Sequence, residues 1–344
     1  RWLDKHFRSL DFLKFCFAIV IVCLHFQQGT GIRFKHFNFF YGRINFYYCV
    51  DLFFIVSGFL LACHLSPQKL QNFKQFIVRK IVRIIPMTSL SVLACLCVSF
   101  FWAIKGKATM PGIWKIINSL TCTFAGGVIK FTDNRGINNP LWYICVLFIC
   151  YAIFFLINKM SERTQINKNY FYFVMILIGC GCNYWKIDLP FLNEYTSRGY
   201  VAFFLGMLLF EYIKKEEKKN GLFFSIFIII FIILCFYFNI MIDDQWAIFT
   251  FILWPAIVVC FLHFENLFPL KIFEILGAVS FEIYILHVPL RDFYYIIRTS
   301  LGISDPFTQI EMIIFVGIVI FVSIPTYLFV EQPIRKYFKQ QGIK

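Results

Sequence analysis

Long apolar runs separated by short polar segments constrain the fold of this chain more than any other feature. Hydrophobic residues make up 60% of the 344 residues and charged residues only 15%, a composition typical of polytopic helical membrane proteins. A helix of about 20 apolar residues crosses a bilayer. We therefore predict an all-α fold, one polytopic integral-membrane helical bundle of about ten transmembrane helices, with residues 1–344 as a single domain. The predicted spans are 10–27, 47–64, 84–104, 141–157, 170–183, 199–212, 222–239, 247–263, 273–290 and 311–330.

The distribution of Lys and Arg predicts how these spans are oriented. With the N-terminus inside, cytoplasmic segments hold 20 of these residues and the outer loops hold 12, so the positive-inside rule places both termini in the cytoplasm. We expect a multi-pass protein of the cytoplasmic (inner) membrane. The net charge of +14 then follows from topology and an anionic leaflet, and we expect no nucleic-acid partner. The sequence leaves the oligomeric state open.

Cysteine is frequent but follows no ligand pattern. Most of the 13 cysteines stand singly within apolar spans, and no C-x-x-C motif has partner ligands. We interpret them as small buried hydrophobes and predict neither a metal site nor disulfides.

Two ionisable residues, Lys14 and His25, lie inside the first apolar run. Such groups are costly at membrane depth and are retained where they pair, line a cavity or perform chemistry. Eleven residues of helix end about 20° beyond three full turns and roughly 16 Å further along the axis. One helix face therefore carries a cation near one membrane surface and an imidazole near the other. Asp11, three residues before Lys14, is a candidate partner for it.

The predicted topology brings Asp51 and His287 to about the outer depth of His25. A contact between Asp51 and His25 would orient the ring and raise its basicity, as a general base near neutral pH requires. We therefore predict His25 and Asp51 as catalytic residues. A purely structural, hydrogen-bonded histidine is the alternative.

Two cations at the start of the third span, Lys80 and Arg83, share a helix face because they are three residues apart. They are either ordinary positive-inside anchors or a grip for a phosphorylated ligand entering from the cytosol. A coenzyme A thioester would suit such a cationic entrance.

Several further side chains are candidates for lining a substrate path. Tyr284 and His287 lie on one helix stripe with Ser280. Structural alternatives exist for the others: a close helix contact at Ser57 and Gly58, and an interfacial anchor at Trp142. Glu331 has an ordinary i,i+4 pair with Arg335 as its alternative. The candidates are Ser57, Trp142, Tyr284, His287 and Glu331.

Seven segments, in order, resemble those of the acyltransferase family 3 membrane proteins. They are LDFLKFCFAIVIVCLH, FFIVSGF, KIVRIIP, PLWYICVLFICY, RGYVAFFLGMLL, SFEIYILHVP and FVEQPIRK. The family opens with a basic residue, usually Arg, then ten residues, then His. Here Lys14 replaces the Arg, which keeps the charge and loses the bidentate fork. Leu147 stands where some members have Glu.

The resemblance implies a membrane O-acyltransferase, most often an O-acetyltransferase, that acts on hydroxyls of surface polysaccharides or lipid-linked sugars. It carries His25 over as the catalytic residue and Lys14, Lys80 and Arg83 as donor-binding cations. Acetyl-CoA or another acyl-CoA would be a co-substrate, with no tightly bound cofactor. His25 would act either as a general base or as an acyl relay.

Two other function classes remain open from the sequence. A transporter or flippase of an envelope glycan precursor would use His25 and Lys14 to bind substrate or relay protons without consuming acyl-CoA. A non-catalytic scaffold would use them to lock helices together.

Overall fold

The computed structural model describes residues 6–35, 37–40, 42–64, 73–127, 135–215, 219–238, 240 and 244–340. Every element in these ranges is helical. The first half contains α1 (Arg8–Thr30), α2 (Cys49–His64), α3 (Phe73–Ile104), α4 (Ile113–Leu120), α5 (Trp142–Thr164) and α6 (Lys168–Tyr184). The second half contains α7 (Glu194–Lys215), α8 (Lys219–Tyr237), α9 (Gln245–Ile248), α10 (Trp254–His263), α11 (Ile272–Ser300), α12 (Gln309–Thr326) and α13 (Gln332–Gln340). Short 3-10 turns are η1 (Phe46–Tyr48), η3 (Phe124–Gly126), η4 (Asn139–Leu141) and η6 (Glu265–Leu267).

These helices confirm the predicted polytopic bundle. Within the described ranges, seven helical stretches are long and apolar enough to cross a membrane, and α8 adds a shorter apolar helix. The remaining predicted spans, 170–183 and 199–212, fall in α6 and α7. A helical segment therefore occupies each predicted position. The largest difference is at α3, which begins at Phe73 instead of residue 84, so that Lys80 and Arg83 belong to its first turns.

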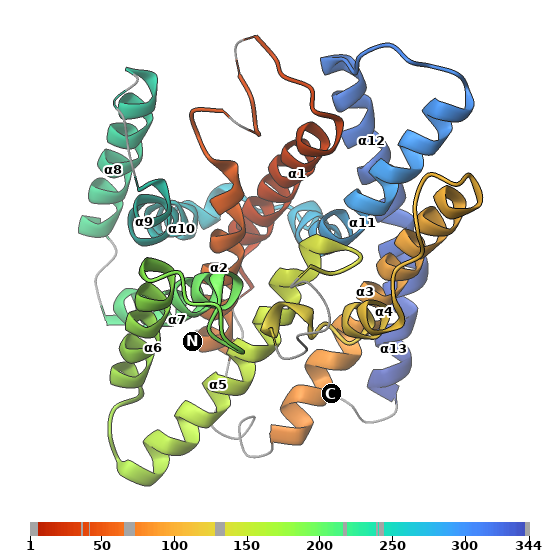
Figure 1. Cartoon of the computed structure of the whole chain (residues 1–344). Coiled ribbons are helices and arrows are strands. Elements are labelled where there is room, and N and C mark those ends of the chain that lie inside the picture. Colours follow the sequence, from red (N-terminus) through yellow and green to blue (C-terminus); the bar gives the residue numbers. More distant parts are fainter. Residues whose placement is uncertain are drawn as a thin grey trace.

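The outward faces of several helices remain apolar. Soluble proteins rarely expose contiguous apolar surface on this scale, whereas a bilayer favours it. Figure 1 shows α8 at one edge of the bundle and α12 and α13 at the other, with α1 and α2 between them. Large exposed apolar side chains on α6, α8 and α12 include Phe173, Leu177, Phe223, Phe227, Phe231, Ile313 and Phe321.

Glycines allow α2 and α7 to pack closely against each other. A Cβ atom on Gly58 would overlap the carbonyl oxygen of Phe203, and one on Gly206 would overlap that of Ile55. Only a residue without a side chain permits backbones to approach this closely. The close helix contact, which the sequence analysis gives as the structural alternative at the Ser57-Gly58 step, is present.

Two π-helical turns interrupt the later helices. One, η5 (Phe249–Leu253), joins α9 to α10, and the other, η7 (Tyr327–Glu331), joins α12 to α13. Such turns add a residue and rotate the register of the next helix, often at functional sites. Here they carry two buried polar side chains, Thr250 and Glu331.

Candidate functional site

A cavity of about 740 Å³ lies at the end of the bundle where α1 begins. Its walls come from α1, α2, α3, α5 and α11, with η7 and α13 closing one side. The volume is in the range of small-molecule sites. All three predicted donor-binding cations, Lys14, Lys80 and Arg83, line this cavity.

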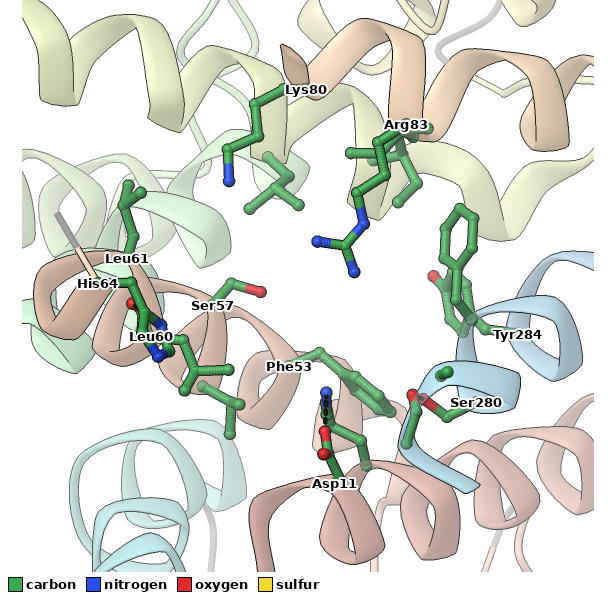
Figure 2. Close-up of a pocket in the computed structure, with 18 of the residues that line it drawn as sticks. Asp11, Phe53, Ser57, Leu60, Leu61, His64, Lys80, Arg83, Ser280 and Tyr284 are labelled. Atoms are coloured by element: carbon green, nitrogen blue, oxygen red, sulfur yellow. Dashed lines mark hydrogen bonds and ion pairs between the residues drawn. The ribbon is translucent and has the colours of Figure 1, made fainter. Parts of the chain in front are cut away.

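Two of these cations project from α3 into the cavity. Figure 2 shows Lys80 and Arg83 reaching towards Phe53 and Ser57 of α2. The Lys80 ammonium lies 4.7 Å from the centre of the Tyr151 ring, a cation–π contact. The Arg83 guanidinium makes no hydrogen bond or ion pair within the described ranges. Both cations are therefore available to an anionic ligand.

The third cation, Lys14, is held in place by an ion pair. Its Nζ atom lies 2.7 Å from Oδ1 of Asp11, as the spacing predicts, and His6 contacts the other carboxylate oxygen. Gly277 of α11 packs so closely on Asp11 that an added Cβ atom would overlap its side chain. Lys14 is thus fixed on the cavity wall where α1 and α11 meet.

Three aromatic rings form the deep end of the cavity. The rings of Phe53, Tyr143 and Tyr284 lie 5.7–6.2 Å apart, centre to centre. The hydroxyl of Tyr143 lies 2.8 Å from Oγ of Ser57, and the Tyr284 hydroxyl donates to the carbonyl of Pro140. Ser57 and Tyr284 therefore line the cavity, as predicted for a substrate path. Their hydrogen bonds fix the aromatic floor.

A pair of imidazoles lies one side chain beyond this floor. The Tyr284 ring centre is 6.0 Å from that of His287, and Nε2 of His287 is 2.9 Å from Nδ1 of His25. The two imidazoles are stacked, with centres 4.9 Å apart. Neither ring is part of the cavity lining. His287 is buried, whereas His25 is partly exposed.

The predicted contact between Asp51 and His25 is wrong. The Asp51 carboxylate is fully buried and accepts hydrogen bonds from Arg198 of α7, at 2.7–2.9 Å, and from Thr250, at 3.0 Å. Close packing of α2 against α7 brings Arg198 to this carboxylate, while His25 is partnered by α11. Asp51 is therefore part of a buried ion pair and does not orient the imidazole.

Trp142 belongs to the same buried cluster. It is 4% exposed, its ring centre lies 5.1 Å from that of Tyr195 in a tilted contact, and the Arg198 guanidinium lies 4.9 Å from the ring. The alternative of an interfacial anchor is therefore wrong, because the indole faces the protein interior. It does not line the cavity either.

Glu331 lines the cavity and forms the predicted i,i+4 pair with Arg335, at 3.5 Å. A second acid, Glu282, lies off the stripe of Tyr284 and His287 and is fully buried. Neither of its carboxylate oxygens has a hydrogen-bond partner within the described ranges. It interacts electrostatically with Glu331.

Sequence patterns missed two residues that organise the site. Arg198 falls in a predicted outer loop, although its position just before the sixth span places it at the depth of Asp51. Arg291 donates to the carbonyl oxygen of His25, at 3.1 Å, and pairs with its neighbour Asp292. The sequence evidence for Arg291 was weaker than that for Arg198, because a cation just beyond a predicted span resembles an ordinary loop charge.

The fold and site define a polytopic helical membrane protein with a cation-lined cavity and an imidazole pair beyond its floor. A family model described as an acyltransferase domain, that of acyltransferase family 3, matches residues 7–329. The match covers most of the chain, so the protein belongs to this family, and the resemblance noted in the sequence is confirmed. It is, in general terms, a membrane acyltransferase. No curated protein and no solved structure matches the chain.

Proposed function

We propose that this protein is a membrane O-acyltransferase that moves an acyl group, in the first instance acetyl, from acyl-CoA to a hydroxyl of a cell-surface polysaccharide or lipid-linked sugar. The supporting observation is a single cavity that gathers Lys14, Lys80 and Arg83 and ends one ring from the His25–His287 pair. The cavity end of the bundle faces the cytosol in this proposal, within the cytoplasmic membrane.

The donor fits the cavity by charge and by shape. Coenzyme A carries phosphates at one end and its thioester at the end of a long, flexible arm. The phosphates bind Lys80 and Arg83, which are available to anions. Lys14 contributes positive potential deeper along the wall. The arm then leads the thioester to the aromatic floor at Tyr284.

His25 performs the acid–base chemistry from the other side of that floor. Its imidazole takes the proton from the acceptor hydroxyl, whose oxygen bonds to the thioester carbonyl carbon. The carbon–sulfur bond breaks, and the proton passes to the departing thiolate. In the relay version, the imidazole first attacks the thioester carbonyl and the coenzyme A thiolate leaves; the acceptor hydroxyl then displaces the imidazole from the acyl group, and its proton passes to the thiolate. General base catalysis typically contributes about 10²- to 10⁴-fold, and positioning of the reactants contributes the rest.

Labelled acetyl-CoA tests the proposal. Purified protein in lipid is offered the label with an extract of envelope glycans, as wild type, as His25→Ala, and as a double variant of Lys80 and Arg83 to Ala. Lys159→Ala is the matched control, because Lys159 is an exposed lysine on α5 whose ion pair is with Glu162, away from the cavity. We expect label in glycan with wild type and control. His25→Ala should lose at least about 100-fold, and the double variant should bind donor more weakly.

Other outcomes would remove the proposal. If folded protein neither binds nor consumes acyl-CoA while glycan precursor crosses the membrane, the transporter is correct. If the variants lose stability and no catalytic or transport activity is lost independently of it, the residues have only a structural role in holding the helices together. Full acyl transfer by His25→Ala would exclude both the base and the relay.

A further inference from the structure

The hydrogen bonds around the imidazole pair determine where its protons lie. Nδ1 of His287 is 3.3 Å from the carbonyl oxygen of Ile283. A carbonyl oxygen can only accept, so Nδ1 of His287 carries the proton. In a neutral imidazole the other nitrogen, Nε2, is then an acceptor. Its partner at 2.9 Å is Nδ1 of His25, which must therefore donate.

The same chain of bonds leaves Nε2 of His25 with a free lone pair. A neutral ring with a proton on Nδ1 has none on Nε2. No N–H or O–H group within the described ranges donates to this nitrogen. His25 is also the more exposed of the two rings. Its unprotonated nitrogen is thus the one that a substrate can reach.

The opposite arrangement, in which Nε2 of His287 donates to Nδ1 of His25, requires an extra positive charge. His287 could donate from Nε2 only as an imidazolium, because its Nδ1 proton is already engaged. Neither ring is paired with a carboxylate within the described ranges. Arg291 binds the backbone carbonyl of His25, and its charge is directed to Asp292. With a guanidinium beside the pair and no acid bonded to it, both rings are neutral.

We propose that His287 is the positioning residue of the site: it holds His25 in the tautomer whose Nε2 is basic, through a relay from the Ile283 carbonyl. This deepens the proposed acyl transfer and rests on it for its catalytic meaning. In this proposal a second histidine orients the catalytic imidazole, a role that a carboxylate often has. The His287 ring also contacts Tyr284 of the cavity floor, so the relay stands next to the path of the donor.

The tautomer can be measured without any activity. Protein labelled with ¹⁵N-histidine and held in lipid gives solid-state NMR shifts that distinguish protonated from unprotonated ring nitrogens. The signals lost in His25→Ala identify His25. We expect a protonated Nδ1 and an unprotonated Nε2 in wild type. His287→Leu should loosen this fixed pattern, so that both tautomers are detected, because among the described residues only the Ile21 carbonyl then remains as an acceptor beside the His25 ring.

Two substitutions of His287 separate positioning from packing. His287→Gln places an amide oxygen near the former Nε2 atom and can still accept from His25. His287→Leu fills similar space with no acceptor. We expect kcat of the Leu variant to fall at least about 10-fold with the KM for acyl-CoA unchanged, and the Gln variant to recover most of it. His263→Leu, on α10 and outside the site, is the control.

The outcomes distinguish this inference from the proposed function. A proton on Nε2 of His25 in wild type would overturn it, as would equal activity of the Gln and Leu variants in well-folded protein. If the protein transfers no acyl group at all, the proposed function fails, while the NMR shifts still decide whether His287 fixes the tautomer.

Discussion

The buried ion pair between Asp51 and Arg198 gives the sharpest stability prediction. Their side chains are 0% and 2% exposed, and the guanidinium also lies 4.2 Å from the Tyr47 ring and 4.9 Å from that of Trp142. Arg198→Met removes the cation and leaves the Asp51 carboxylate with two neutral donors within the described ranges, the Thr250 hydroxyl and the Trp246 indole. Breaking a buried pair in this way costs about 3–5 kcal/mol. That corresponds to roughly 150- to 5,000-fold in the folding equilibrium.

A double variant tests whether the charge is the cause. Asp51→Asn combined with Arg198→Met removes both charges, and we expect it to regain about 1–4 kcal/mol over the single Arg198→Met variant. Unfolding in mixed micelles with increasing denaturing detergent gives the free energies for wild type, Arg198→Met, Asp51→Asn and the double variant. Acetyl-CoA binding, measured where each variant is still folded, is expected to stay unchanged, because neither residue lines the cavity.

Two results would refute this reasoning. One is a stability of Arg198→Met within about 1 kcal/mol of wild type, which would mean that the carboxylate finds another partner. The other is loss of acyl transfer by Asp51→Asn in protein that is folded and still binds donor. That would restore Asp51 to the catalytic part that the sequence predicted for it.

Three further substitutions test the cavity wall. Lys14→Arg keeps the cation that Asp11 binds, so we expect a KM for acetyl-CoA within about threefold of wild type in a steady-state titration; a much larger rise would show that an ammonium is required. Gly277→Ala sets a methyl group against Asp11, and detergent unfolding should show a loss of about 1–3 kcal/mol; no loss would mean that the helices separate easily. Glu282→Gln removes a buried acid that lies beside a second acid, Glu331, so stability in the same assay should not fall, since two neighbouring acids are costly to bury. A clear fall would show that the Glu282 carboxyl group is needed.

Local features of the site could be predicted from the sequence because helix geometry fixes them. The pair of Lys14 with Asp11 and that of Glu331 with Arg335 result from spacings of three and four residues. The shared face of Lys80 and Arg83 has the same origin. Apolar run lengths located the spans for a similar reason, since a bilayer sets the length of a crossing helix.

Contacts between helices were harder to predict, because topology gives the depth of a residue and not its direction around the bundle. Asp51 had two basic groups at its depth, His25 and Arg198, and the sequence offered no way to choose between them. Two glycines determine which basic residue pairs with Asp51. Gly58 and Gly206 allow α2 to pack closely against α7, which brings Arg198 within hydrogen-bond distance of the carboxylate. The same contact explains why Trp142 is covered instead of facing lipid.

The relation between α1 and α11 bears on the number of membrane crossings. These helices touch near their starts, where Gly277 packs on Asp11, and again further along, where His287 bonds to His25. The earlier residue of α1 contacts the earlier residue of α11, and the later residue contacts the later one. The two helices therefore run in the same direction. If only the seven longest apolar stretches crossed the membrane, α11 would be the sixth crossing and would run opposite to α1. With α6, α7 and α8 included it is the ninth, and the directions agree. The parallel contact that builds both ends of the site therefore requires α11 to be an odd-numbered crossing, which excludes the count of seven and agrees with ten. With ten, the last crossing returns Glu331 and Arg335 to the cavity that Lys14 lines.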